Sequence, residues 1–129
     1  MGWEVADDGL KAIFSRDIPN LVTTQLQESA SEFLARHGLV IDDIDRFICH
    51  PGGPKVITAL EHAFGLEQGA LVEARAVLRD YGNMSATTVM FVLERILGRA
   101  GATAGRWERA LMNALGPGFT AGFLVLDNR

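Results

Sequence analysis

The first group in the sequence that could do chemistry is His50-Pro51-Gly52-Gly53-Pro54. The apolar run before it, residues 46–49, predicts a short buried strand, and the residues after it predict a helix. In open α/β sheets ligands bind at the carboxyl ends of strands. There, glycine lets the backbone approach a ligand and a helix N-terminus favours negative charge. A rigid turn with a hydrogen-bonded histidine would explain the same residues, so this motif alone leaves both interpretations open.

Two further segments could carry chemistry or could be plain turns. Asn83 lies in Gly82-Asn83-Met84-Ser85, in a predicted loop before a helix. Its amide could donate hydrogen bonds to an anionic oxygen, although asparagine also favours left-handed turns. The third segment, Gly116-Pro117-Gly118, is typical of a tight bend between two strands.

The remaining reactive side chains favour structural roles. Cys49 is next to His50 on a predicted strand, where adjacent side chains point to opposite faces, so we expect a small core residue and not a nucleophile. His37 is expected at a helix C-terminus and His62 in solvent. The acidic loop residues lack the glycine and closing glutamate of a calcium loop, and no metal site is predicted: Asp42, Asp43 and Asp45.

The elements that would position these residues begin with a hairpin. Strands are predicted at 3–6 and 10–14 around the turn Asp7-Asp8-Gly9. A helix is predicted over 18–37, with an apolar face that should pack on a sheet. That face comprises Val22, Leu26, Ala30, Phe33 and Leu34.

The second half is predicted to alternate helices and strands. A helix should end at Gly65, residues 66–80 should form a short helix or turn, and a third helix should begin at a Ser85 cap and close at Gly98. Its expected buried residues are Val89, Met90, Leu93 and Leu97. Strands are predicted at 107–115 and 120–127, and the run 123–126 (FLVL) suits a strand buried on both faces. The order of elements indicates an α/β layered domain.

Composition narrows the class of protein. The chain has 129 residues, 48% hydrophobic and 22% charged, which suits one globular domain. Its net charge of −4 gives no electrostatic case for nucleic acid. No apolar run is long enough to span a membrane, the N-terminus lacks signal-peptide features, and one cysteine makes no internal disulfide. We therefore expect a soluble, cytoplasmic protein.

Considered together, three segments carry a family resemblance. FICHPGGPKVI (47–57), VLRDYGNMSATTVMFVLE (77–94) and ALGPGFTAGFLVL (114–126) occur in this order, after SRDIPNLV (15–22). The set closely resembles the C-terminal domain of the type III polyketide synthases, the chalcone/stilbene synthase family, particularly its bacterial members. The resemblance covers residues 1–129. It implies the C-terminal half of a thiolase-like fold, a layered mixed sheet with helices packed on it, with the N-terminal half absent.

The resemblance also implies catalytic residues. Family members use a Cys-His-Asn triad, in which the histidine matches His50 and the asparagine matches Asn83. The cysteine belongs to the N-terminal half, and Cys49 does not match it. The implied reaction is a decarboxylative Claisen condensation of malonyl-CoA onto an acyl-CoA starter. In it, two N–H donors would stabilise the thioester enolate, and a protonated His50 would lower the pKa of the cysteine. The chain alone should be inactive, because it lacks the nucleophile.

Further expectations follow from the same resemblance. The match places Gly52, Gly53 and Lys55 near the approach of CoA, and Gly116, Pro117 and Gly118 in a loop that shapes the cavity. No cofactor beyond the CoA thioesters is implied, and the intact enzyme should be a homodimer. A bulky gating phenylalanine of the plant enzymes falls at Ala12, which would widen the cavity.

Two other interpretations remain. The chain could be half of a ketoacyl-carrier-protein synthase III-like condensing enzyme, although that family typically carries HQAN-like and GNTS motifs. It could also be a non-catalytic module that dimerises or binds a partner. If the chain is half of a condensing enzyme of either family, the third helix and residues 123–126 would leave an apolar face uncovered. We therefore expect the isolated chain to self-associate, most simply as a twofold dimer.

Overall fold

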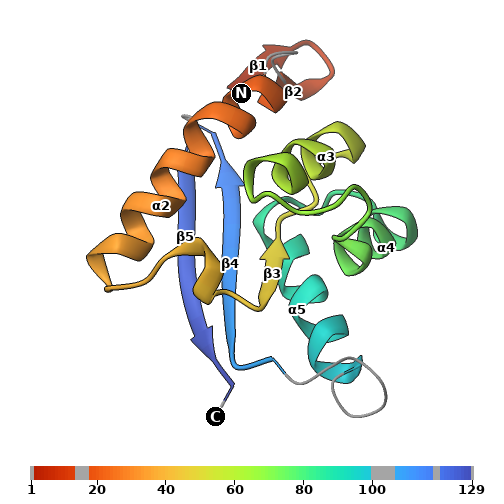
Figure 1. The fold of residues 1–129 in the computed structure, drawn as a ribbon. Coiled ribbons are helices and arrows are strands. Elements are labelled where there is room, and N and C mark those ends of the chain that lie inside the picture. The colour runs from red at the N-terminus through yellow and green to blue at the C-terminus, as the bar shows by residue number, and fades with distance from the viewer. Residues whose placement is uncertain (1, 14–17, 100–106, 118–119, 129) are drawn as a thin grey trace.

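The N-terminal hairpin forms as predicted. The computed structural model describes residues 2–13, 18–99, 107–117 and 120–128. Strands β1 (Gly2–Ala6) and β2 (Gly9–Ile13) pair antiparallel around the Asp7-Asp8 turn. The hairpin lies at one end of the molecule in Figure 1.

The predicted helix over 18–37 is present, but it contains a π-helical segment. It runs as α1 (Ile18–Leu21), η1 (Val22–Leu26) and α2 (Gln27–Arg36), where η1 is the π-helical part. Four of the five predicted face residues are buried and the fifth, Phe33, is half-buried. Gly38 follows with a φ of +70°, a left-handed conformation that suits the end of a helix.

Three strands form the main sheet in the order β3-β4-β5. Strand β3 (Arg46–Cys49) runs parallel to β4 (Arg109–Gly116), and β5 (Thr120–Asp127) runs antiparallel to β4. Parallel neighbours need a long crossover connection. Three helices make it: α3 (Pro54–Ala63), α4 (Val72–Tyr81) and α5 (Thr88–Arg99).

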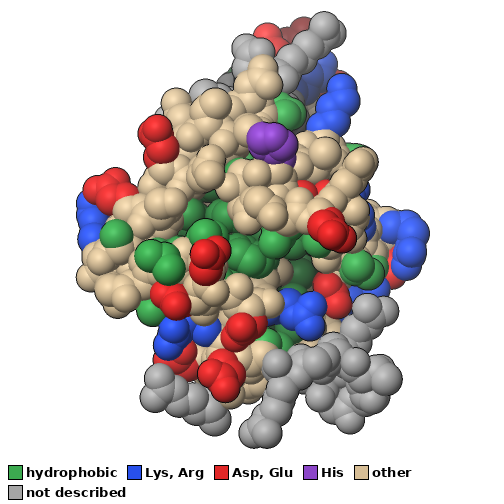
Figure 2. All heavy atoms as spheres, in the orientation of Figure 1, with side chains coloured by type: hydrophobic (Ala, Val, Ile, Leu, Met, Phe, Trp, Pro, Cys, Tyr) green, Lys and Arg blue, Asp and Glu red, His purple; other side chains and the backbone are tan. Residues whose placement is uncertain are grey.

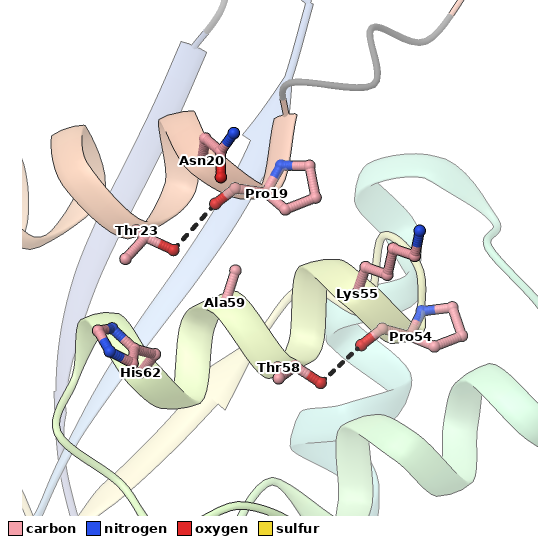
Figure 3. Close-up of a pocket in the computed structure, with 8 residues that line it drawn as sticks. All are labelled: Pro19, Asn20, Thr23, Pro54, Lys55, Thr58, Ala59 and His62. Carbon is pink, nitrogen blue, oxygen red and sulfur yellow. Dashed lines mark hydrogen bonds between the residues drawn. The ribbon is translucent and has the colours of Figure 1, made fainter.

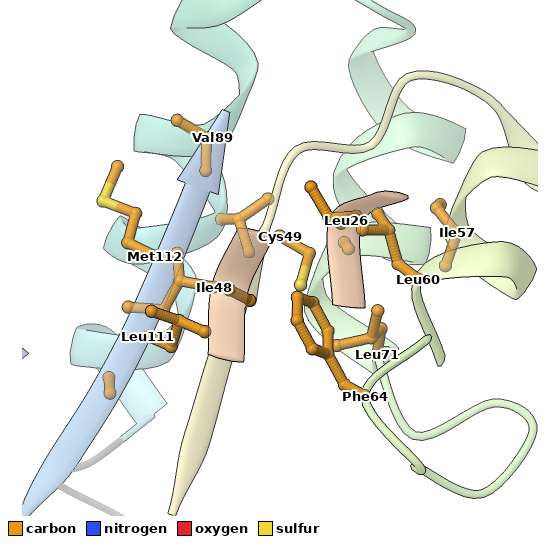
Figure 4. Packing of buried hydrophobic residues seen from close by; sticks show 14 of the residues in the cluster. Leu26, Ile48, Cys49, Ile57, Leu60, Phe64, Leu71, Val89, Leu111 and Met112 are labelled. Atoms are coloured by element: carbon orange, nitrogen blue, oxygen red, sulfur yellow. The ribbon is translucent and has the colours of Figure 1, made fainter. Parts of the chain in front are cut away.

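Helices pack on both faces of this sheet (Figure 1). On one face, Phe33 of α2 stacks on Phe123 with ring centroids 5.6 Å apart, and Phe64 after α3 stacks on Phe47 at 5.0 Å. Helix α5 covers the other face, and Figure 4 shows Val89 and Met112 on the opposite side of β3 from Phe64. Hydrophobic side chains remain visible over the sheet between α2 and α3 (Figure 2). None of the helices in the described part of the chain is long and apolar enough to cross a membrane.

The structure corrects several sequence-based boundaries. Residues 72–81 form the complete helix α4, where only a short helix or turn was predicted. Ser85 does not cap the third helix, because it lies inside a 3-10 turn (Ser85–Thr87) with a φ of +62°. Gly98 does not close α5, which continues to Arg99.

Two predictions of burial were wrong. The run 123–126 is not buried on both faces: Leu124 is 57% exposed on one face, and Phe123 and Val125 are only half-buried on the other. On α5 the buried stripe is Val89, Val92 and Ile96, whereas Met90 is 52% and Leu97 50% exposed. The helix therefore turns part of its apolar surface away from the sheet.

Cys49 is a core residue, as the alternation of strand side chains predicts. Its side chain is buried, and its sulfur points toward Leu26 and Phe64 (Figure 4). Burial raises the pKa of the thiol far above its ordinary value, so the thiolate that would react with an electrophile is scarcely populated.

We predict that iodoacetamide labels Cys49 slowly in the folded chain and rapidly in urea, because native labelling requires the core to open. Mass spectrometry of timed samples measures both rates. Cys49→Ala should cost about 1 kcal/mol of stability, as a small core change does. Equal labelling rates in the two states would contradict this placement of the thiol.

Candidate functional site

His50 lies immediately beyond the carboxyl end of β3. Its backbone N–H donates to Asn113 O of β4 at 3.2 Å, so the parallel ladder extends to this residue. The side chain is only 5% exposed. The chain then turns: Gly52 N–H donates to His50 O at 3.0 Å, and α3 begins at Pro54.

The surroundings of His50 favour the neutral form of its imidazole. Burial lowers its pKa, because the charged ring loses more solvation than the neutral ring. The protonated form expected from the resemblance is therefore disfavoured in this chain. A neutral imidazole still has one N–H to donate. A Cβ placed on Gly52 would lie 3.6 Å from His50 Nε2, so the Nε2 edge of the ring faces this glycine.

Asn83 joins the second loop to the first. Helix α4 ends at Gly82, whose φ of +73° lets the chain turn. Asn83 Nδ2 donates to Gly52 O at 3.1 Å, and Asn83 Oδ1 accepts a hydrogen bond from Ser85 N at 2.8 Å. The second bond fixes which end of the amide is oxygen. One Nδ2 hydrogen is used by Gly52, and the other is left for a ligand.

A buried ion pair that the sequence analysis missed connects the two helices behind these loops. Glu61 of α3 is fully buried and accepts hydrogen bonds from Arg75 Nη2 at 2.6 Å and from Leu71 N at 3.1 Å. Burial raises the pKa of this carboxyl, but the hydrogen bonds from Arg75, Gly69 and Leu71 and the charge of Arg75 outweigh it, so the pKa lies below its ordinary value. A second pair, Arg95–Asp80 at 2.5 Å, joins α5 to α4.

Known proteins share the sequence and the fold of this chain. Residues 2–128 match the family model for the chalcone and stilbene synthases, C-terminal domain. The chain belongs to the chalcone and stilbene synthase family. The expected family is thereby confirmed.

Two bacterial proteins and one algal crystal structure illustrate the similarity of this chalcone and stilbene synthase domain to its relatives. A protein from Bacillus subtilis (strain 168) is 42% identical over 127 residues, covering 98% of this chain and 34% of the relative. The 1,3,6,8-tetrahydroxynaphthalene synthase of Streptomyces peucetius subsp. caesius is 41% identical over 126 residues, covering 98% and 33%. The crystal structure of PKS-I from the brown alga Ectocarpus siliculosus has a TM-score of 0.88 at 29% identity, covering 98% and 34%.

These matches establish two facts. The fold is thiolase-like, a mixed sheet with helices packed on it, as the resemblance implied. The chain spans about a third of the length of the curated relatives it matches.

In this synthase domain, Lys55 lies in the first turn of α3 and is exposed. It borders a groove of about 570 Å³ between the α1–η1 segment and α3, with Lys55 at one end and His62 at the other (Figure 3). The backbone of Gly53 is extended at this point, with a φ of 166°, so its conformation does not require glycine. The full lining is Pro19, Asn20, Thr23, Pro54, Lys55, Thr58, Ala59 and His62.

The third predicted segment lies at the carboxyl end of β4. Gly116 is the last residue of β4 and pairs with Thr120, whose hydroxyl donates to Pro117 O at 2.9 Å. Because β3 and β4 are parallel, their carboxyl ends lie at the same end of the sheet, so Gly116 and His50 are both found there. Gly118 lies outside the described residues, as does the side chain of Ala12.

The other candidates have structural surroundings. The ring of His37 packs against Phe33 at 4.9 Å, and His62 is exposed. Asp45 accepts hydrogen bonds from the backbone N–H groups of Arg109 and Glu108 at 3.0 Å, and these bonds lower its pKa. Within the described residues, no group of three or more His, Cys, Asp or Glu side chains is placed to hold a metal ion.

We predict that the free energy of unfolding decreases in acid, because protonation of the buried His50 opposes folding. Its pKa is lower in the folded chain than in the unfolded chain, so its stabilising contribution is complete above about pH 6.5 and is lost as pH falls through the folded pKa. Urea unfolding between pH 7.5 and 5 should show a smaller loss of stability in His50→Gln than in the parent. An imidazole NMR titration of His50 at or above pH 6.5 would contradict the desolvated environment.

Proposed function

We propose that this chain supplies the enolate-stabilising half of a type III polyketide synthase. The observation that carries the proposal is the 3.1 Å hydrogen bond from Asn83 Nδ2 to Gly52 O, which joins the His50 and Asn83 loops at one edge of the sheet. These side chains offer N–H donors beside a turn where a thioester oxygen could approach the backbone. The matched family supports the reaction class.

The proposed reaction is a decarboxylative Claisen condensation. Malonyl-CoA loses CO₂, and the electron pair of the broken C–C bond becomes a thioester enolate. Hydrogen bonds from His50 and the free N–H of Asn83 stabilise the negative charge on its oxygen. The enolate carbon then attacks an acyl thioester, a new C–C bond forms, and the thiolate leaves. No base is needed, so a neutral His50 suits this step.

The nucleophilic cysteine is supplied by the region that the relatives carry beyond the match. Cys49 does not fit that role because it is buried and its pKa is raised. We propose that Lys55, Gly52 and Gly53 lie along the approach of the CoA thioester, and that the turn at 116–118 forms part of the cavity wall. The enzyme needs no cofactor beyond its CoA substrates and acts as a cytoplasmic homodimer.

Exposed apolar residues support a partner-binding surface. Met90 and Leu97 lie seven residues apart on α5, and Leu124 has the same register as Met112 on the α5 side of the sheet. Val5 and Leu10 pair across the hairpin and are both exposed. Large exposed apolar residues on several elements commonly mark an interface. We propose that the region that the relatives carry beyond the match covers these surfaces.

We predict that this chain alone forms no polyketide from radiolabelled malonyl-CoA. In the assembled enzyme, with this chain joined to the remaining region of a bacterial relative, His50→Ala or Asn83→Ala should slow malonyl-CoA decarboxylation by about 10²–10³-fold, the usual loss for one oxyanion donor. His37→Ala, a change of an exposed histidine immediately after α2, is the matched control and should have little effect. Near-parental decarboxylation in either site variant would remove that residue from the proposed role.

We predict that the isolated chain self-associates at micromolar concentration, most simply as a twofold dimer. The charged double variant Met90→Lys/Leu124→Lys should shift it toward monomer, because it places a charge at two of the exposed apolar positions. Light scattering measures the mass. A monomeric parent chain that binds no hydrophobic dye would show that the domain needs no partner.

A further inference from the structure

Thr88 has an unusual position for a hydroxyl group. Its side chain is 0% exposed at the first residue of α5, five residues after Asn83. The hydroxyl accepts a hydrogen bond from Met84 N at 2.8 Å and donates one to Ser85 O at 2.6 Å. A single side chain therefore satisfies two backbone groups in the turn between Asn83 and α5.

That turn contains a residue in a costly conformation. Ser85 has a φ of +62°, in the left-handed region that residues other than glycine seldom enter. Such a conformation persists only where the surrounding structure holds it. The hydroxyl of Thr88 bonds Met84 N and Ser85 O, and its backbone N–H also donates to Ser85 O and Ala86 O, so this residue closes the turn onto the helix.

The conformation of Ser85 in turn sets the direction of the Asn83 amide. Ser85 N–H donates to Asn83 Oδ1 at 2.8 Å, while Asn83 Nδ2 donates to Gly52 O. An amide held at both ends cannot flip, and its remaining N–H has one fixed direction. If Ser85 relaxed, its N–H would leave Oδ1 and the amide would gain rotational freedom.

We propose that Thr88 is a positioning residue for the condensation site: its hydroxyl holds Ser85 in the conformation whose N–H orients the side-chain amide of Asn83. This inference rests on the proposed function, because it assigns the oriented N–H to the enolate oxygen. Thr88 itself touches no reacting atom and acts through Asn83.

The test compares Thr88→Val, which removes the hydroxyl at similar size, with Thr88→Ser, which keeps it and removes a methyl group. In the assembled enzyme, Thr88→Val should lower kcat for malonyl-CoA decarboxylation by roughly 10–100-fold, because small misplacements of a catalytic group cost rates of this order. KM should change by less than about threefold, since ground-state binding is not affected. Thr88→Ser should stay within about threefold of the parent. If Thr88→Val does not fold, Thr88→Ala against Thr88→Ser makes the same comparison.

A double-mutant cycle separates action through Asn83 from general damage. In an Asn83→Ala background, Thr88→Val should cause no further loss of kcat, because the group it positions is gone. Additive losses, equal losses in the valine and serine variants, or a parental rate in Thr88→Val would each overturn the proposal.

An NMR measurement on this chain keeps the inference distinct from the proposed function. In the parent chain, the two Nδ2 protons of Asn83 should be well separated and exchange slowly. They should converge and exchange faster in Thr88→Val but not in Thr88→Ser. If Asn83→Ala has no effect on decarboxylation, the proposed function fails, and this comparison still decides whether Thr88 positions the amide. Unchanged Asn83 signals in Thr88→Val would overturn it.

Discussion

Parallel pairing of β3 with β4 is the constraint on which the arrangement of the site depends. It requires a connection that returns the chain to the same end of the sheet, and α3, α4 and α5 provide it. The pairing brings the ends of both strands to one edge, where His50 follows β3 and Gly116 ends β4. The crossover then brings Asn83 back to within hydrogen-bond distance of Gly52. Two loops that are separate in sequence therefore lie together as one candidate site.

Polar contacts between the crossover helices fix the position of α3 relative to α4. The Glu61–Arg75 pair lies at the far ends of α3 and α4 from the His50 and Asn83 loops, so the two helices are tied at both ends. A buried carboxylate is costly unless it is fully hydrogen-bonded, and Glu61 is bonded by Arg75 and by backbone N–H groups. Removing one partner would leave an unpaired charge in the core. These contacts can therefore specify the helix arrangement even where they add little net stability.

The sequence predicted the elements with strong local signals. The hairpin at Asp7-Asp8, the strand at 46–49 and the helix after Pro54 are all present.

The prediction failed where burial or conformation is set by residues distant in the sequence. Burial of the run 123–126 depends on what packs on each face of β5, and the apolar run itself does not show whether one face or both are covered. Helix α4 buries Glu73 and Ala74, which weakens its apolar stripe, and the Ser85 conformation depends on the hydroxyl of Thr88. His50 and Asn83 were found through motifs, whereas Glu61, Arg75 and Thr88 carry no local signature.

We propose that His50 and Asn83 both donate hydrogen bonds to one thioester oxygen. The most direct measurement is isotope-edited infrared spectroscopy of a non-decarboxylating malonyl-CoA analogue, carbon-13-labelled at the thioester carbonyl and bound to the assembled enzyme. We expect a carbonyl stretch shifted to lower frequency than in water-free solvent. Each of His50→Ala and Asn83→Ala should reverse part of that shift while the analogue remains bound. A carbonyl frequency that is the same in the parent and in both variants would contradict the account.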